Sequence, residues 1–252
     1  MVAVILMCFI TADEALKEAL GETDLTERSA KFFKACLLLF KSSMFNDAMK
    51  YFSEINDAEL FVNLATDDYV NSKLFEMGRI QQLKKLLYDA LEKLGYIKDP
   101  KAKIQWALRI ADSLFKIGLV HESSRIIGFT LKQIESLPAD EIDDLLCSLA
   151  EIQSKISNYQ EARKTASKIR RSEKKSLALL YIVKAFTFRG QIDEAVLTAS
   201  EITDPVQKSN AYTYIAAALI KNRNIHEAKL IAALITIPAW KQKIDHWIKA
   251  YT

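Results

Sequence analysis

The feature that most constrains the fold is a short motif that recurs along the chain at intervals of 33 to 40 residues. Its clearest copy is Gly190-Gln191-Ile192-Asp193-Glu194-Ala195, and we take its last residue as the reference position. Spacing of this kind predicts stacked pairs of antiparallel helices, with the motif at the turn inside each pair. Seven copies align, spaced by 33, 35, 40, 39, 33 and 33 residues, with references at Ala15, Ala48, Leu83, Ser123, Ala162, Ala195 and Ala228.

Other positions of the repeat carry matching side chains. The residues four and seven positions after the reference are mostly apolar, and with the reference they form one face of a helix. Thirteen and twelve positions before it stand an apolar residue and then a mostly small one, as in Ile215-Ala216. We expect the small residues to let the two helices pack closely. Three positions before the reference, six of the seven copies have a large apolar residue, which we expect to cover the corner.

Composition favours an all-α protein. Half of the 252 residues are hydrophobic and 27% are charged, whereas 6 Gly and 4 Pro are too few for the many tight turns of an all-β fold. Cys8, Cys36 and Cys147 lack metal-binding or disulfide-scaffold spacing, which favours a reducing compartment. The apolar run Met1 to Ile10 is too short to cross a bilayer. We therefore expect no membrane span and a cytoplasmic location.

The repeat columns resemble those of the tetratricopeptide repeat family. The shared features are a small residue midway along the first helix, a Gly-x-φ-x-x-Ala turn, and a small or apolar residue four positions later, and they are clearest from Asp140 to Ile237. The period is mostly 33 residues, against about 34 in the family. Most copies lack the first-helix Trp, and the closing proline is irregular. A HEAT-like solenoid is the alternative for the longer central copies.

The resemblance implies one elongated domain over residues 1–252. We predict a right-handed α-solenoid of about seven antiparallel two-helix repeats, closed by a C-terminal capping helix at 238–251. One face of that helix carries Trp240, Ile244, Trp247, Ile248 and Tyr251. The predicted hairpins lie at about 1–22, 26–56, 66–94, 100–137, 139–171, 173–203 and 205–237.

In this family the first helices line a concave surface, and this predicts a binding groove. The residues eight and seven positions before the reference would face it. They combine Phe with recurring Lys, which suits an apolar helix or extended peptide of a partner protein with an acidic flank. The alternative is that the Phe column belongs to the core between repeats. The candidate groove residues are Phe40, Phe75, Phe115, Lys41, Lys116, Lys155 and Lys221.

A basic segment suggests a second kind of partner. The net charge is only +3, but residues 1–100 carry 12 Lys or Arg against 16 Asp or Glu, and the remainder 23 against 16. Such a patch is either a solvated helix face or a site for RNA or another polyanion. Its members are Arg163, Lys164, Lys168, Arg170, Arg171, Lys174 and Lys175.

Nothing in the sequence predicts catalysis. It contains no nucleotide-binding, nucleophile-elbow or zinc-protease motif. The carboxylate pairs Asp67-Asp68 and Asp143-Asp144 fall in predicted first turns of helices, where negative charge is stabilised. We expect a protein-binding scaffold with no enzymatic activity, cofactor or metal. A third interpretation is self-association through the helix at Val2 to Phe9, which is apolar on every side.

Overall fold

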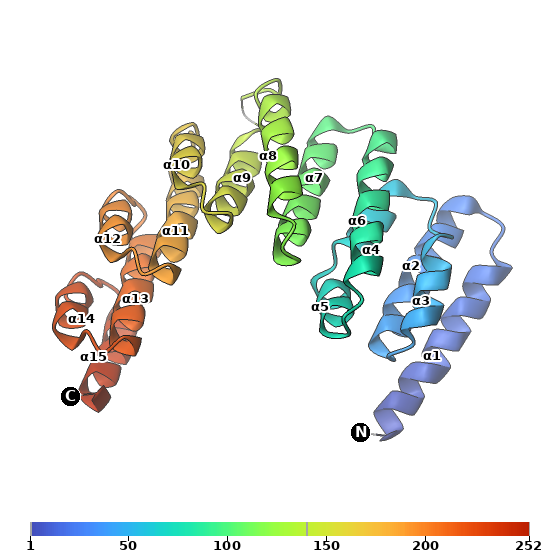
Figure 1. Ribbon diagram of the computed structural model, residues 1–252, viewed down its shortest axis with the longest axis horizontal. Coiled ribbons are helices and arrows are strands. Elements are labelled where there is room, and N and C mark those ends of the chain that lie inside the picture. The colour runs from blue at the N-terminus through green and yellow to red at the C-terminus, as the bar shows by residue number, and fades with distance from the viewer. Residues whose placement is uncertain (1, 140, 252) are drawn as a thin grey trace. The chain divides into compact units, whose positions relative to one another are not determined.

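The computed structural model describes residues 2–139 and 141–251, with the side chains of residues 2–10 outside the description. The described residues form fifteen α-helices and one short 3-10 helix, without a strand, and this confirms the all-α class (Figure 1). In chain order these are α1 (Val2–Gly21), α2 (Leu25–Lys41), α3 (Phe45–Phe52), α4 (Ala58–Ala65), α5 (Asp68–Glu76), α6 (Ile80–Lys93), η1 (Leu94–Tyr96), α7 (Pro100–Lys116), α8 (Val120–Ile134), α9 (Asp143–Lys155), α10 (Tyr159–Ser167), α11 (Ser172–Phe188), α12 (Ile192–Ser200), α13 (Pro205–Lys221), α14 (Ile225–Ala232) and α15 (Pro238–Tyr251).

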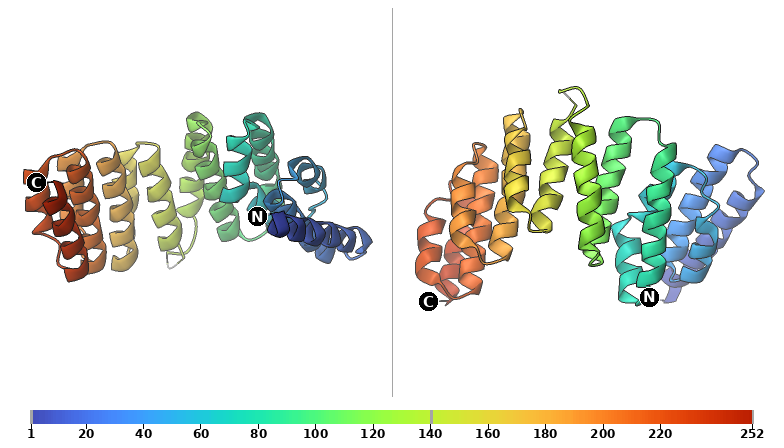
Figure 2. Two further views of the ribbon diagram at one scale, coloured as in Figure 1. Left: turned by 90° about the horizontal axis from the view of Figure 1, so that it is seen from below. Right: turned by 45° about the horizontal axis from the view of Figure 1, so that its top comes forward.

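The chain divides into two compact units, residues 1–126 and 127–252, and the division falls within α8. In the first unit α2 packs against α1, α3 and α4, and α6 packs against α4, α5 and α7. In the second unit α11 packs against α9, α10, α12 and α13, and α13 also contacts α14 and α15. Both views in Figure 2 show neighbouring helices running side by side within each unit.

Six turns share one backbone geometry. In each of them two backbone hydrogen bonds close the turn. The residue five positions before the reference donates its N–H to the carbonyl of the residue three before itself, and the residue after it donates its N–H to the carbonyl of the residue five before itself. Gly190 N to Thr187 O is 3.1 Å and Gln191 N to Phe186 O is 3.0 Å, which is the Schellman ending of a helix. The residues with positive φ are Ser43 (63°), Gly78 (70°), Gly118 (85°), Ser157 (67°), Gly190 (76°) and Arg223 (62°).

The predicted first hairpin is wrong. The segment 1–22 was expected to turn at Thr11 to Ala15, but α1 continues through it from Val2 to Gly21. The residue that would need a positive φ is Ile10, whose branched side chain makes that conformation very unfavourable. Because Ile10 cannot readily form the turn, the helix continues.

A second difference lies between α3 and α6, where α4 was not predicted. Asp57 caps α4 by accepting a hydrogen bond from Leu60 N at 2.8 Å, and Asp67 caps α5 through Val70 N at 3.0 Å. Thr66, which directly precedes Asp67, ends α4, with its hydroxyl donating to Val62 O at 2.8 Å. Two short helices therefore take the place of one long first helix in this repeat.

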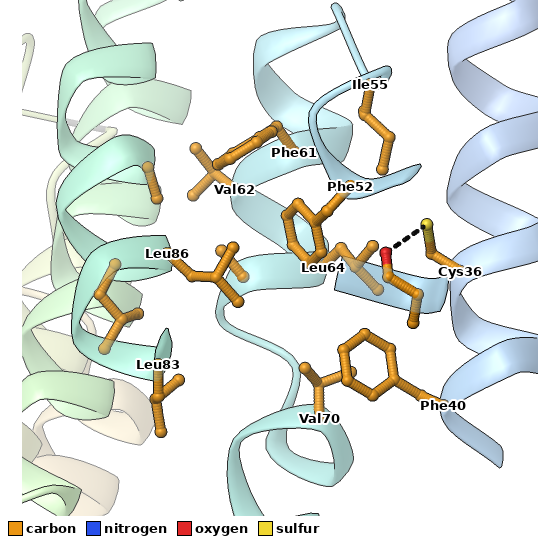
Figure 3. Packing of buried hydrophobic residues seen from close by; sticks show 14 of the residues in the cluster. Cys36, Phe40, Phe52, Ile55, Phe61, Val62, Leu64, Val70, Leu83 and Leu86 are labelled. Atoms are coloured by element: carbon orange, nitrogen blue, oxygen red, sulfur yellow. Dashed lines mark hydrogen bonds between the residues drawn. The ribbon is translucent and has the colours of Figure 1, made fainter. Parts of the chain in front are cut away.

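The core follows the predicted columns. Wherever side chains are described, the residues at the reference and at four and seven positions after it are buried, except Glu22 in the first copy, as are those thirteen and twelve before it. Figure 3 shows the close helix contact that these columns produce: the Cys36 thiol lies 3.5 Å from Ala48 O. The large apolar residues three positions before the reference were expected to cover the turns, and only some of them do. Phe45 is buried, whereas Ile80 and Val120 are exposed.

A buried polar residue near the start of the first helix anchors the loop that follows the second helix. Asp143 accepts hydrogen bonds from the amides of Arg170 and Arg171 at 3.1 and 2.8 Å. We call this the loop-anchoring position, nineteen residues before the reference. Serine replaces aspartate there in three repeats, where Ser29 accepts from Asn56 N and Asp57 N at 3.1 and 3.2 Å, Ser176 from Asp204 N at 3.2 Å, and Ser209 from Thr236 N at 3.3 Å.

The last helix is only partly covered. Ile244 and Ile248 are buried, and α15 packs against α13 and α14 as a terminal helix. Trp247 and Tyr251, expected on the same covered face, are exposed. At the other end, the side chains of the predicted self-association segment Val2 to Phe9 lie outside the described residues. Across the helices that the structure describes, none combines the length and apolar character that crossing a membrane requires.

Candidate functional site: two exposed surfaces

The predicted Phe column does not act as one surface. Phe40 is fully buried, and its ring meets that of Phe45 edge-on at 6.0 Å between centroids. In Figure 3 it points into the core beside Val70. Phe75, by contrast, is 49% exposed, and Phe115 is half-buried. Phe40 is therefore removed from the candidate groove, and Phe75 remains.

Three further exposed apolar residues lie at turns of the same unit, and the predicted groove did not include them. Met77 and Ile80 flank the same α5–α6 turn and are 43% and 39% exposed, and Val120, which occupies the position of Ile80 in the α7–α8 turn, is 40% exposed. The α2–α3, α5–α6 and α7–α8 turns lie along one edge of the first unit (Figures 1 and 2). We call Phe75, Met77, Ile80 and Val120 the apolar edge.

Polar contacts hold this edge in place. Arg79, in the α5–α6 turn, donates to Asn46 Oδ1 in α3 at 2.7 Å. Lys116 in α7 bonds to Asp68 of α5 at 2.7 Å and to Asp112 at 2.8 Å. Burial disfavours the charged form of Lys116, but the two carboxylates outweigh it and raise its pKa. The ammonium expected to contact a ligand is thus already engaged within the unit.

The other predicted groove lysines differ in their surroundings. Lys41 is exposed at the end of α2 in the first unit. Lys155 and Lys221 belong to the second unit, at the ends of α9 and α13, and Lys155 bonds to Glu151 at 2.9 Å. Each of these lysines stands in a last turn of a helix, where positive charge is favourable in any case.

The basic segment is largely neutralised by carboxylates of the same unit. Arg163 pairs with Glu201, Lys164 with Glu161, Lys168 with Glu135, Arg171 with Asp143 and Asp144, and Lys174 with Asp144. In the part of the chain that the structure describes, only Arg170 and Lys175 of the seven have no carboxylate partner. Most of the positive charge that suggested a polyanion site is therefore used internally.

The predicted acid pair Asp143-Asp144 serves the fold. Burial opposes ionisation of Asp143, but the two amide donors and the Arg171 guanidinium lower its pKa. Hydrogen bonds from Lys174 and Arg171 lower the pKa of Asp144. Two carboxylates held ionised by local donors are suited to anchoring the loop rather than to proton transfer near neutral pH.

The second unit has a surface that the sequence interpretation missed. α11 and α13 are neighbours, and Lys184 of α11 lies over the rings of Tyr181 and Tyr214, 5.8 and 4.5 Å from their centroids. Phe188, one turn further along α11, is 90% exposed. Burial, with Glu151 adding to it, raises the pKa of Tyr181. The signal was present in the sequence, since Tyr181 and Tyr214 are 33 residues apart, the period of the repeat.

Comparison with known proteins adds little to this geometry. No family model and no curated protein matches the chain. Among solved structures, the chain is similar to Ton1535 from Thermococcus onnurineus NA1, with a TM-score of 0.36 and 13% sequence identity, over 100% of this chain and 99% of that one. Similarity at this level carries no argument about fold or function.

Proposed function

We propose that this chain is a non-catalytic interaction scaffold, a tetratricopeptide-like, right-handed α-solenoid whose apolar edge binds a segment of another protein. The repeated Schellman turns and the buried reference column support the solenoid, because both recur at the repeat positions. The two buried cysteines are free thiols, which fits a reducing compartment such as the cytoplasm.

The observation that carries the proposal is the exposure of Phe75, Met77, Ile80 and Val120. The backbone geometry of these turns does not require apolar residues at such positions. Met77 corresponds to Ser42, Arg189 and Asn222 in three other turns with the same hydrogen bonds. Burial of apolar surface contributes about 25 cal/mol per Å². An apolar edge exposed in this way is therefore stabilised when a partner covers it, which is the usual meaning of such patches.

Two other functions have less support. Binding of RNA or another polyanion would use the basic segment, but five of its seven cations already face carboxylates. Self-assembly through the first helix remains a prediction from the sequence alone. Neither explains the apolar edge.

The test is affinity capture with the intact chain and two variants. The first replaces Phe75 and Met77 with Ser, and the second, a matched control, replaces Leu25, which is 65% exposed at the start of α2 in the same unit. We expect a partner retained by the wild-type and Leu25→Ser chains and lost by the double variant, with all three giving the same helical circular dichroism.

Salt separates the alternatives. A partner bound through apolar contacts should stay bound as ionic strength rises, whereas a polyanion should dissociate steeply. If a folded double variant retains every partner of the wild type, the apolar edge is not a binding surface and the proposal fails.

A further inference from the structure

The face formed by α11 and α13 carries positive charge held in a fixed position. Lys184 lies over two tyrosine rings, and this cation–π arrangement restricts where its ammonium can go. Within the described residues Lys184 contacts no carboxylate, and neither does Lys221 at the end of α13. Glu151 on the neighbouring helix α9, the acid that adds to the raised pKa of Tyr181, is engaged by Lys155 at 2.9 Å. This face therefore has ammonium groups whose charge the unit does not neutralise.

An apolar anchor stands beside that charge. Phe188 follows Lys184 by one helical turn on α11, and it is 90% exposed, more than any other large apolar side chain that the structure describes. Tyr214 on α13 is 45% exposed and offers further aromatic surface. An exposed Phe in the last turn of a helix contributes nothing to the core, so a ligand contact gives it a role that the fold does not.

We propose that the α11–α13 face binds a protein segment in which a carboxylate lies close to an apolar side chain. The carboxylate would accept a hydrogen bond from Lys184, and the apolar side chain would pack on Phe188 and Tyr214. Charge complementarity selects this occupant, because the face has cations without acid partners. It is separate from the apolar edge, which lies in the other unit, so the two proposals can fail independently.

A protein segment fits this face better than a nucleic acid does. Base stacking needs a free aromatic face, and the Lys184 ammonium covers one face of each tyrosine. A nucleic acid binds through a run of cations along its phosphates, and most of the clustered cations of this unit already pair with carboxylates. A single carboxylate needs only the Lys184 ammonium.

The experiment uses the full chain and an array of labelled peptides in which one Glu stands at varied spacing from a Leu, each with its Gln counterpart. Fluorescence anisotropy measures binding to the wild type and to Lys184→Met, Phe188→Ser and Lys229→Gln. Lys229, exposed on α14, provides the matched control for loss of a surface lysine. A labelled oligouridylate tests the nucleic-acid alternative.

We expect at least one Glu peptide to bind more tightly than its Gln counterpart. Lys184→Met should remove that preference and weaken binding about tenfold, the loss of one charged hydrogen bond. Phe188→Ser should weaken Glu and Gln peptides alike, while Lys229→Gln and the Phe75/Met77 double variant should bind as the wild type does.

The proposal is overturned if no Glu peptide binds, if Gln peptides bind equally well, or if Lys184→Met leaves the preference intact in a folded chain. Binding of the oligouridylate that depends on Lys184 and exceeds that of every peptide would also overturn it, and would assign the face to nucleic acid.

Discussion

Asp143 provides the sharpest test of the repeated packing. Replacing it with Ala leaves the amides of Arg170 and Arg171 without the acceptor they now have at 3.1 and 2.8 Å. A buried donor without a partner costs about 1 to 3 kcal/mol. Two such donors would cost about 2 to 6 kcal/mol if fully buried. Because these loop amides are only partly buried and regain some water, we expect Asp143→Ala to lower the free energy of unfolding by about 2 to 3 kcal/mol.

Two variants make this prediction specific. Asp144 is 46% exposed at its side chain and makes only ion pairs, so Asp144→Ala should cost less than about 1 kcal/mol. Asp143→Ser installs the residue that anchors the same loop at Ser29, Ser176 and Ser209. Asp143→Ser should therefore retain at least half of the stability that Asp143→Ala loses. Urea unfolding followed by far-ultraviolet circular dichroism measures the free energy of unfolding of Asp143→Ala, Asp144→Ala and Asp143→Ser.

Acid should reduce the contribution of Asp143. Burial opposes the shift, but the amides and Arg171 lower its pKa below 3.8 in the folded chain. A carboxyl whose pKa is lower when folded stabilises the fold above its unfolded pKa, and that stability is lost as pH falls through the folded value. The difference between wild type and Asp143→Ser should therefore shrink below pH 3.8. The reasoning fails if Asp143→Ala costs no more than Asp144→Ala, or if the difference grows in acid.

Three further predictions follow from the fold. Arg223→Gly should raise the free energy of unfolding by about 0.5 to 1 kcal/mol in a urea titration, because Arg223 has a φ of 62°, and a decrease would contradict that geometry. Phe52→Ala should lower the free energy of unfolding by about 3 to 5 kcal/mol in the same assay, since its ring is buried and its centroid lies 4.9 Å from that of Phe61. A decrease below about 1 kcal/mol would contradict the place of Phe52 in the core. Burial raises the pKa of Cys36 to about 12 and of Cys147 to about 11, so mass spectrometry should find both unmodified by iodoacetamide until the chain unfolds, and labelling of the native chain would contradict their burial.

The repeat positions could be predicted from the sequence because each depends on local chemistry. Gly78, Gly118 and Gly190 tolerate the positive φ of the turn, and small residues recur wherever two helices come close. The same logic explains the error at the start of the chain. Ala12 and Ala15 matched the spacing, but the turn position between the expected helices was Ile10. Helix α4 was missed because eight residues give too short a periodic signal.

The candidate surfaces depend on contacts that spacing does not contain. Phe40 and Phe75 occupy the same repeat position, yet Phe40 is covered by Phe45, whereas the counterpart of Phe45 next to Phe75 is the exposed Ile80. The same holds for charge. Lys168, just after α10, pairs at 2.6 Å with Glu135, just after α8, and only the packing of the helices brings the two together. The basic segment therefore looked more positive in sequence than it is in the folded unit.

Photo-crosslinking from position 75 tests the central proposal most directly. The photoreactive analogue p-benzoylphenylalanine keeps an aromatic ring in place of Phe75, and the same analogue in place of the exposed Leu25 provides a control within the same unit. Irradiation of cells that express the chain, followed by mass spectrometry of its adducts, records what touches each position. The apolar edge predicts a discrete protein adduct from position 75 that is absent from position 25. No adduct from position 75, or identical adducts from both positions, would contradict the account.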